Sequence, residues 1–381
     1  MRFKTRMIPL AGALIFACAT TASAQEEVVK IGHVAPLTGE IAHLGKDNEN
    51  GARMAIDELN AKGTMIGGQK VKFVLLSEDD AADPKQATAV AQKLVDAGVD
   101  GVIGHLNSGT TIPASRIYYD AGIPEISPST TSPKYTEQGF NTTFRVVAND
   151  AQLGGVLGRY AVNQLHAKTV AIIDDRTAYG QGVAEEFGKS ARKAGARIVS
   201  RQYTNDQATD FNAILTAIKG AHPDLIFFGG MDAVAGPMLR QMRQLDITAK
   251  FMGGDGICTA QLGPLAGNSM ADDQVYCAEA GGVDAQHEKS MAAFRAAYQK
   301  KFGTNIKLYA PYVYDAVMTM VAAMQEAKSP DPAKYLPYLA KIHYDGVTGD
   351  IAFDAKGDIQ NGMLSIYTYK GGKRQLLEVT K

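Results

Sequence analysis

Polar side chains gather where a short apolar stretch, Gly101–Ile103, leads into an expected helix. Asn107, Ser108, Thr110 and Thr111 stand at the start of that helix. The first turn of a helix leaves backbone N–H groups without partners, and the helix dipole favours negative charge there. Such an end can bind a small anion, for example a carboxylate. By itself, the stretch fits a structural helix cap equally well.

The segment 104–111 also resembles a phosphate-binding loop in its spacing of glycines. Thr110, however, stands where such a loop needs a lysine to reach the phosphates. A nucleotide site is therefore excluded, whereas an anion site that needs only N–H and hydroxyl donors is not.

Two further polar loops follow expected strands. Ser129, Thr130 and Thr131 form a hydroxyl cluster after the strand 123–127, and Asp255 stands in a glycine-rich loop after the strand 251–253. The aspartate could receive a ligand ammonium group. Hydroxyls and aspartates are also ordinary turn residues, so each loop alone is explained as a turn.

The sequence offers no catalytic or cofactor motif. His287 and Glu288 are not followed by a second histidine at zinc-protease spacing, and no Gly-x-Ser-x-Gly or Gly-x-Gly-x-x-Gly pattern is placed to act. A formal net charge of −1 gives no broad footprint for nucleic acid. We therefore predict a protein that is not an enzyme and that uses no cofactor, metal or nucleic acid.

Strands and helices alternate along the chain in two successive series, 28–127 and 169–253. This rhythm predicts right-handed crossovers and parallel sheets. At 381 residues the chain exceeds what one core usually fills, so we expect two doubly wound, Rossmann-like α/β lobes with a ligand cleft between them. Ligands of such folds bind beyond the carboxyl ends of the strands, where the polar loops above lie.

Residues 1–24 have the features of a secretory signal peptide. Arg2, Lys4 and Arg6 precede a short apolar run, and small residues precede an expected cut after Ala24. A lipoprotein cut before Cys18 is the alternative. Removal of the leader shifts the net charge from −1 to −4, because it takes three basic residues and no acidic one. We expect a periplasmic protein.

The mature chain then contains two cysteines, Cys258 and Cys277. An exported protein meets an oxidising compartment, which favours a disulfide between them over two buried thiols.

Several stretches acting together resemble the periplasmic leucine/isoleucine/valine-binding proteins of ABC transporters. No single motif carries the resemblance, which covers essentially the whole mature chain. The stretches are Val34–Gly39, Ile56–Gly63, Asp83–Ala87, Gly104–Leu106, Ile126–Ser129, Tyr179–Gly182, Asp210–Phe211 and Phe353–Asp354.

The resemblance implies the class I periplasmic binding protein fold, with lobes that close on a free amino acid. It implies that Ser108 and Thr131 contact the α-carboxylate of the ligand. Thr131 and the backbone carbonyl of Ser129 would also contact the α-ammonium. Asp255 would face the ammonium, where the family often has glutamate. The other implied contacts are backbone from Asn107 and Thr130, Tyr179 over the ligand, and Tyr309 as an aromatic wall.

Two positions depart from the family pattern. Leu44 and Met231 stand where the family has tyrosines, which bears on side-chain specificity and removes one hydroxyl contact at Met231. Asp232 next door could compensate. Asp255 is one methylene shorter than glutamate, so a small lobe shift or a bridging water could be needed.

The resemblance implies a monomeric receptor that delivers leucine, isoleucine, valine or phenylalanine to an inner-membrane ABC permease. The alternatives are a receptor for an aromatic amino acid or a small amide, and a sensor that regulates rather than transports. The expected lobes are 25–148 with 279–354, and 149–278 with 355–381.

Overall fold

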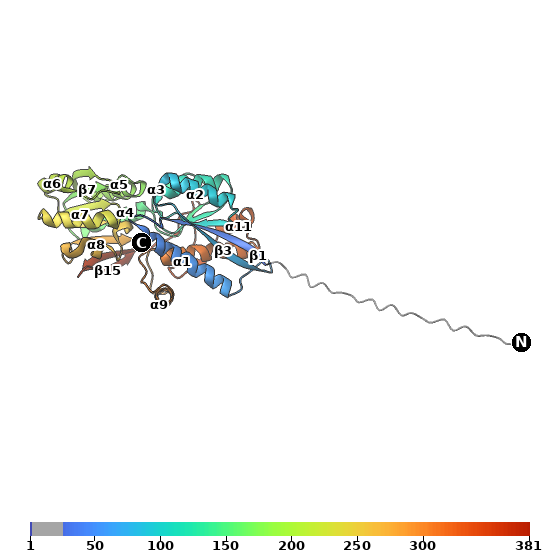
Figure 1. Ribbon diagram of the computed structural model, residues 1–381. Coiled ribbons are helices and arrows are strands. Elements are labelled where there is room, and N and C mark those ends of the chain that lie inside the picture. Colours follow the sequence, from blue (N-terminus) through green and yellow to red (C-terminus); the bar gives the residue numbers. More distant parts are fainter. Residues whose placement is uncertain (2–25) are drawn as a thin grey trace.

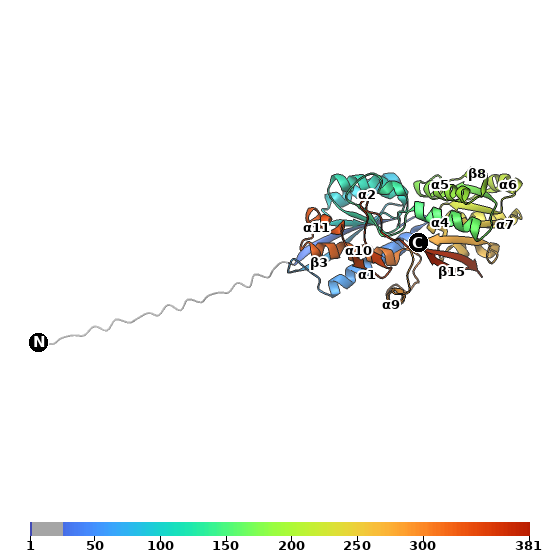
Figure 2. The same cartoon turned by 180° about the vertical axis from the view of Figure 1, so that it is seen from behind.

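The computed structural model describes Met1 and residues 26–381. The predicted leader, its cut after Ala24 and Cys18 lie outside the described residues. The described chain forms two α/β lobes, each built on its own sheet (Figures 1 and 2). No helix within residues 26–381 has both the length and the apolar character that crossing a membrane requires.

The first lobe is built on a six-stranded sheet in the order β2-β3-β1-β4-β5-β6. Its pairs are parallel except for the short hairpin of β2 with β3. Both faces are buried: Ile31 of β1 packs into one apolar cluster and Val34 into another, as in parallel sheets covered by helices on both sides. The strands are β1 (Glu27–Ala35), β2 (Met65–Ile66), β3 (Gln69–Asp79), β4 (Gly101–Ile103), β5 (Glu125–Ser127) and β6 (Thr143–Arg145).

Helices from two distant parts of the chain cover this first sheet. Helices α1 and α10 pack against each other, as do α2 and α3. The C-terminal helices α10 and α11 lie beside the N-terminal strands in both views (Figures 1 and 2). The helices are α1 (Ala42–Ala61), α2 (Pro84–Asp96), α3 (Ser108–Asp120), α9 (Glu288–Phe302), α10 (Ala310–Glu326) and α11 (Pro332–Leu339).

The second lobe has a seven-stranded sheet in the order β15-β14-β11-β10-β9-β7-β8. Strands β7 to β11 are parallel, and β14 and β15 add an antiparallel edge. The strands are β7 (Thr169–Asp174), β8 (Arg197–Tyr203), β9 (Leu225–Gly229), β10 (Lys250–Gly253), β11 (Val275–Glu279), β14 (Leu364–Lys370) and β15 (Lys373–Thr380). The helices are α4 (Asp150–Asn163), α5 (Ala178–Lys193), α6 (Asn212–Gly220), α7 (Asp232–Gln244) and α8 (Leu262–Ala266).

The chain passes between the two lobes between β6 and α4, between β11 and α9, and after the small pair β12 (Tyr344–Asp345) and β13 (Asp350–Ile351). Multiple connections of this kind allow the lobes to hinge while each stays rigid.

The two cysteines of the described chain form the predicted disulfide. Cys258 follows β10 and Cys277 lies in the adjacent strand β11, with their Cα atoms 5.3 Å apart. The bridge therefore braces the loop that carries Asp255.

The first helix begins earlier than its apolar spacing predicts, at Ala42 rather than Asn50. Its first turns bury polar residues, so an apolar-face criterion misses them. Gly51 permits close packing there, because a β-carbon at this position would lie 2.3 Å from the carbonyl oxygen of Ala310. The Asp47 carboxylate accepts backbone N–H groups from the segment 307–310 at 2.8–3.0 Å.

Candidate functional site

The start of α3 offers unused donors. The amides of Ser108 and Gly109 have no acceptor among residues 26–381. The Ser108 hydroxyl accepts the Ser132 N–H at 3.3 Å, so its own proton is free to donate. The Thr110 and Thr111 hydroxyls instead lie 2.9 and 2.8 Å from the Asn107 carbonyl and cap the helix. Of the three hydroxyls at the start of α3, only that of Ser108 is therefore available to a ligand.

The loop after β5 lies beside this helix start. The Ser129 hydroxyl donates to the carbonyl of Leu106 at 3.0 Å, and the hydroxyls of Thr130 and Thr111 lie 2.5 Å apart. The Thr131 hydroxyl differs from these, because it is buried and has no partner in the described chain. Among the three predicted loop residues, Thr131 has the hydroxyl that is available to a ligand.

A fully buried arginine, which the sequence analysis did not single out, holds this loop. Arg145 Nη1 donates to the carbonyls of Thr130 and Ser132, at 2.9 Å each, and its Nε pairs with Asp358 at 2.5 Å. The sequence signal that could have identified Arg145 is a charged residue within a strand whose neighbours are mostly apolar. Its ion-pair partner Asp358 lies 213 positions along the chain, which local patterns do not reveal.

Asp255 lies buried in the turn after β10, opposite this loop. Its two carboxylate oxygens accept hydroxyls from Tyr179 at 2.9 Å and Tyr309 at 2.8 Å. Burial raises the pKa of the Asp255 carboxyl to about 6, although both tyrosine hydroxyls act to lower it. Tyr309 stands at the start of α10 in the first lobe, where Asp47 accepts its N–H. The Tyr309–Asp255 bond therefore joins the two lobes.

A second bond between the lobes involves Asp232 at the start of α7. Its Oδ2 lies 2.9 Å from Nε2 of His43 in α1 and 2.5 Å from the Thr259 hydroxyl. Its other oxygen, Oδ1, is buried without a partner among the described residues. His43 was not predicted, and its pairing with a residue 189 positions away has no signature in the sequence.

A cavity of about 500 Å³ lies between the lobes at these strand ends. Of the predicted site residues, Asn107, Tyr179 and Met231 line it. The others are buried and are not part of its lining: Ser108, Ser129, Thr130, Thr131, Asp232, Asp255 and Tyr309. Leu44 of α1 is likewise fully buried and outside the lining. The neighbouring Thr38 to Ile41 segment lines the cavity in its place.

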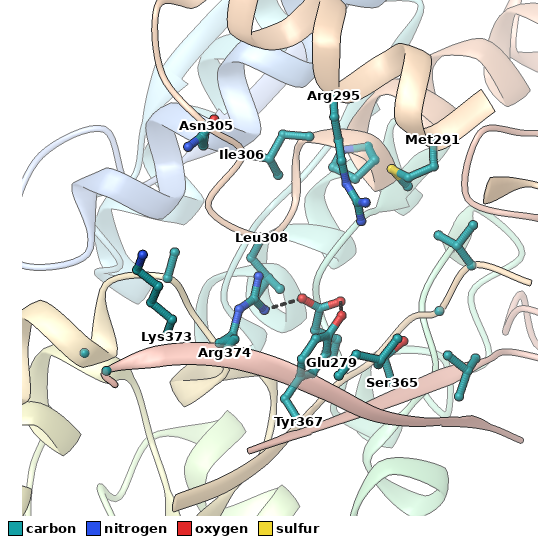
Figure 3. A pocket seen from close by; sticks show the side chains of 18 of the residues that line it. Glu279, Met291, Arg295, Asn305, Ile306, Leu308, Ser365, Tyr367, Lys373 and Arg374 are labelled. Carbon is teal, nitrogen blue, oxygen red and sulfur yellow. Dashed lines mark hydrogen bonds and ion pairs between the residues drawn. The ribbon is translucent and has the colours of Figure 1, made fainter. Parts of the chain in front are cut away.

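A larger groove, of about 1500 Å³, lies elsewhere between α9 and the strands β14 and β15 (Figure 3). Arg295 and Met291 extend from α9 on one side, facing Glu279, Tyr367 and Arg374 on the other. Arg374 pairs with Glu279, so the charges on the strand side satisfy each other. None of the predicted site residues lines this groove.

Donors of the first lobe and the buried carboxylate of the second thus come close to the smaller cavity, because Gly109 and Tyr179, the hydrogen-bond partner of Asp255, both line it. Residues 28–373 match the family model described as a periplasmic binding protein. The chain belongs to the periplasmic binding protein family. This family comprises binding proteins that act outside the cytoplasm, and it is not a class of enzymes.

Relatives within the family confirm the resemblance to leucine/isoleucine/valine-binding proteins. The chain is 36% identical over 345 residues to the Leu/Ile/Val-binding protein homolog 1 of Brucella abortus, covering 90% of this chain and 91% of the relative. The leucine-binding protein LivK of Thermotoga maritima superposes with a TM-score of 0.85 at 26% identity, over 93% and 99% of the two chains. LivJ of Streptococcus pneumoniae, solved with isoleucine, gives 0.83 at 28% identity, over 93% and 100%. The protein therefore has the predicted class I fold.

Proposed function

We propose that the protein is the substrate-binding receptor of an ABC importer, and that it captures free leucine, isoleucine or valine between its lobes. The observation that carries this proposal is the pairing of unused donors on the first lobe with the buried Asp255 carboxylate on the second. This arrangement matches a zwitterion, with its carboxylate and its ammonium a few ångströms apart.

The ligand carboxylate would bind at the start of α3. The amides of Ser108 and Gly109, together with the hydroxyls of Ser108 and Thr131, supply donors that the described chain leaves unused. The positive end of the helix dipole favours the same charge. Enclosing a carboxylate costs several kcal/mol unless it is paired in this way.

The ligand ammonium would bind near Asp255 and the carbonyl of Ser129, to which no hydrogen bond runs within residues 26–381. Tyr179 and Tyr309 hold the carboxylate of Asp255 in place from both lobes. An ammonium beside Asp255 would favour the ionised carboxylate, because an opposite charge nearby stabilises the charged form.

The ligand side chain would extend toward the apolar part of the cavity. Met231, Ile41 and Ala233 line that part, drawn from both lobes. Burial of a leucine-sized side chain contributes about 1.5–3 kcal/mol. A methionine in place of a tyrosine leaves a flexible apolar wall, which suits side chains of different branching.

Closure of the lobes would couple ligand capture to delivery. The Tyr309–Asp255 and His43–Asp232 bonds exist only while the lobes are together. A ligand that contacts both lobes shifts the open–closed equilibrium toward this form. An inner-membrane permease can then distinguish the loaded receptor from the empty one by its shape.

The proposal includes the lobe boundaries predicted from the sequence, 25–148 with 279–354 and 149–278 with 355–381. It also includes a monomeric state, export by the leader 1–24 and cleavage after Ala24. Mass spectrometry of the protein from a periplasmic extract tests the cut directly, because a mature chain that begins at Gln25 is expected.

A thermal-shift screen of ligand-stripped protein over the twenty amino acids tests the ligand class. Leucine, isoleucine and valine should raise the melting temperature, since a ligand at 100 times its Kd adds about 2.7 kcal/mol to the native state. A shift only with phenylalanine or another aromatic amino acid would replace the branched-chain assignment with that alternative. No shift with any amino acid would reject the receptor proposal.

A further inference from the structure

Asp150 is a buried carboxylate with no role in the fold that its contacts explain. It is the first residue of α4, its side chain is fully buried, and neither oxygen has a hydrogen-bond partner among residues 26–381. Helix capping does not account for it, because the Asn149 side chain already accepts the Gln152 N–H at 3.2 Å. A buried, unpartnered carboxylate costs several kcal/mol if it is ionised.

The surroundings of Asp150 place it beside the proposed ammonium site. Its backbone N–H donates to the Thr131 carbonyl at 2.7 Å, and the Thr131 hydroxyl is likewise buried without a partner. On the opposite side, α5 approaches so closely that a β-carbon at Gly182 would lie 3.1 Å from Asp150 Oδ2. The Thr131 hydroxyl acts to lower the pKa of Asp150, so the two groups face each other although no hydrogen bond joins them. A ligand ammonium at this point would contact both.

The charges around Asp150 leave it without a protein counter-ion. Asp255, in the turn after β10, and Glu186 of α5 are both acidic, and Tyr179 of α5 is a neutral phenol. Among the described residues, the cation with the largest effect on it is Arg145 of β6, whose donors are taken by Asp358, the Thr136 hydroxyl and the loop carbonyls. Burial, followed by the charge of Asp255, raises the pKa of the Asp150 carboxyl to about 8.

We infer that Asp150 is a second acidic partner of the ligand ammonium, that it selects amino acids over carboxylic acids without an amine, and that it releases a proton when the ligand binds. The inference rests on the proposed function and specifies its ammonium site. In the empty protein the carboxyl is mostly protonated at neutral pH. An incoming ammonium supplies the missing positive charge and favours the ionised form, so the proton leaves to the solvent.

Titration calorimetry with two probes tests the selectivity. Leucine and 4-methylpentanoate share a side chain and a carboxylate, but only leucine has the ammonium. Asp150→Asn should weaken leucine binding by at least about tenfold, as for the loss of a charged hydrogen-bond partner, and leave the affinity for 4-methylpentanoate unchanged or higher. Equal losses for both probes would show a merely structural role and overturn the inference.

The proton release is measured with leucine at pH 7.5 in two buffers of different ionisation enthalpy. The wild type should release a large fraction of one proton, whereas Asp150→Asn should release none. Asp315→Asn is the matched control: Asp315 is equally buried and its pKa is raised to about 6, but Val347 and Thr348 satisfy its oxygens far from the cavity. This control should keep the wild-type proton release.

If Asp150→Asn does not fold, proton release by the wild-type protein on leucine binding tests the role of Asp150 by itself. Leucine binding without any proton release at pH 7.5 would overturn the role of Asp150 while leaving the proposed function standing. No binding of any branched-chain amino acid would overturn both.

The ligand-free protein gives a further readout. A carboxyl whose pKa is raised in the folded state stabilises the fold below its unfolded pKa, and that stability is lost as the pH rises through the folded pKa. The unfolding free energy of the wild type should therefore fall between pH 6 and pH 8, and Asp150→Asn should flatten this fall. An identical fall in the variant would contradict the inference.

Discussion

The two hollows of this protein differ in size and, more instructively, in what their polar groups do. In the groove beside α9, of about 1500 Å³, the half-buried arginine Arg374 is paired with Glu279. The inter-lobe cavity is a third as large, at about 500 Å³. Between the lobes, Thr131 and Asp150 carry buried polar groups that have no hydrogen-bond partner in the described chain. Buried polar groups are normally satisfied, so each unpaired one calls for an explanation.

The comparison indicates that volume is a poor guide to the binding site here. A groove whose least exposed charges, Arg374 and Glu279, already pair gains little from a ligand there. Buried donors and a buried acid that have no partners gain each bond that a ligand brings. The account therefore predicts that substitutions around the small cavity affect amino-acid binding and that substitutions in the large groove do not.

The largest effect is expected from Asp255→Ala. Loss of the carboxylate that faces the ligand ammonium should weaken leucine binding about 100-fold or more, because truncating one partner of a buried charge pair costs roughly 2–5 kcal/mol. Asp232→Ala is the matched control, since Asp232 is equally buried but pairs with His43 and Thr259. Calorimetry that found the greater loss with Asp232→Ala would reject the ammonium assignment.

Thr131→Val should weaken leucine binding about tenfold. The substitution nearly keeps the side-chain volume but removes the hydroxyl, and the lost hydrogen bond is worth roughly 1–1.5 kcal/mol. Thr110→Val serves as its control, because the Thr110 hydroxyl donates to the Asn107 carbonyl and not into the cavity. The leucine Kd values of the two variants test this prediction. Equal losses of affinity in both would mean that the Thr131 hydroxyl does not contact the ligand.

A several-fold loss should follow His43→Ala. His43 contacts Asp232 across the lobes, so its removal favours the open form, and a hydrogen bond of this kind contributes about 0.5–1.5 kcal/mol. Small-angle scattering of the ligand-free variant should show a larger radius of gyration than the wild type. An unchanged radius together with an unchanged Kd would remove this contact from the closure mechanism.

The smallest effect, less than about twofold, is expected from Arg295→Ala in the large groove. The exposed Arg295 side chain has no ion pair within residues 26–381 and lies away from the inter-lobe cavity, and substitutions of this kind usually change free energies by at most about 0.5 kcal/mol. A loss of leucine affinity as large as that of Thr131→Val would show that the groove takes part in binding and would break the comparison.

Much of this architecture could be read from the sequence, because local patterns specify it. The alternation of strands and helices predicts two parallel-sheet lobes, and parallel sheets bring strand ends such as those before Ser129 and Asp255 to the same edge. The disulfide followed from export and from having two cysteines. The start of α1 was missed because its buried face is polar, with Asp47 bonded to a segment some 260 residues away.

Contacts between residues far apart in the sequence also explain which parts of the site were not predicted. Asp150 lies before Leu153, where the apolar spacing of α4 begins, and its significance comes from the absence of partners, which only packing reveals. Arg145 and His43 act through residues 213 and 189 positions away. Leu44, implied as a ligand contact by the family resemblance, is fully buried in α1, and its part in the site stays a prediction. Contacts at such separations depend on the tertiary fold and not on local sequence.

The most direct test of the central claim is calorimetric titration of ligand-stripped wild-type protein with leucine, isoleucine and valine. The account predicts saturable binding with one site per chain, abolished or greatly weakened by Asp255→Ala. No heat with any of the three amino acids, over a range of temperatures at which the protein is folded, would contradict it.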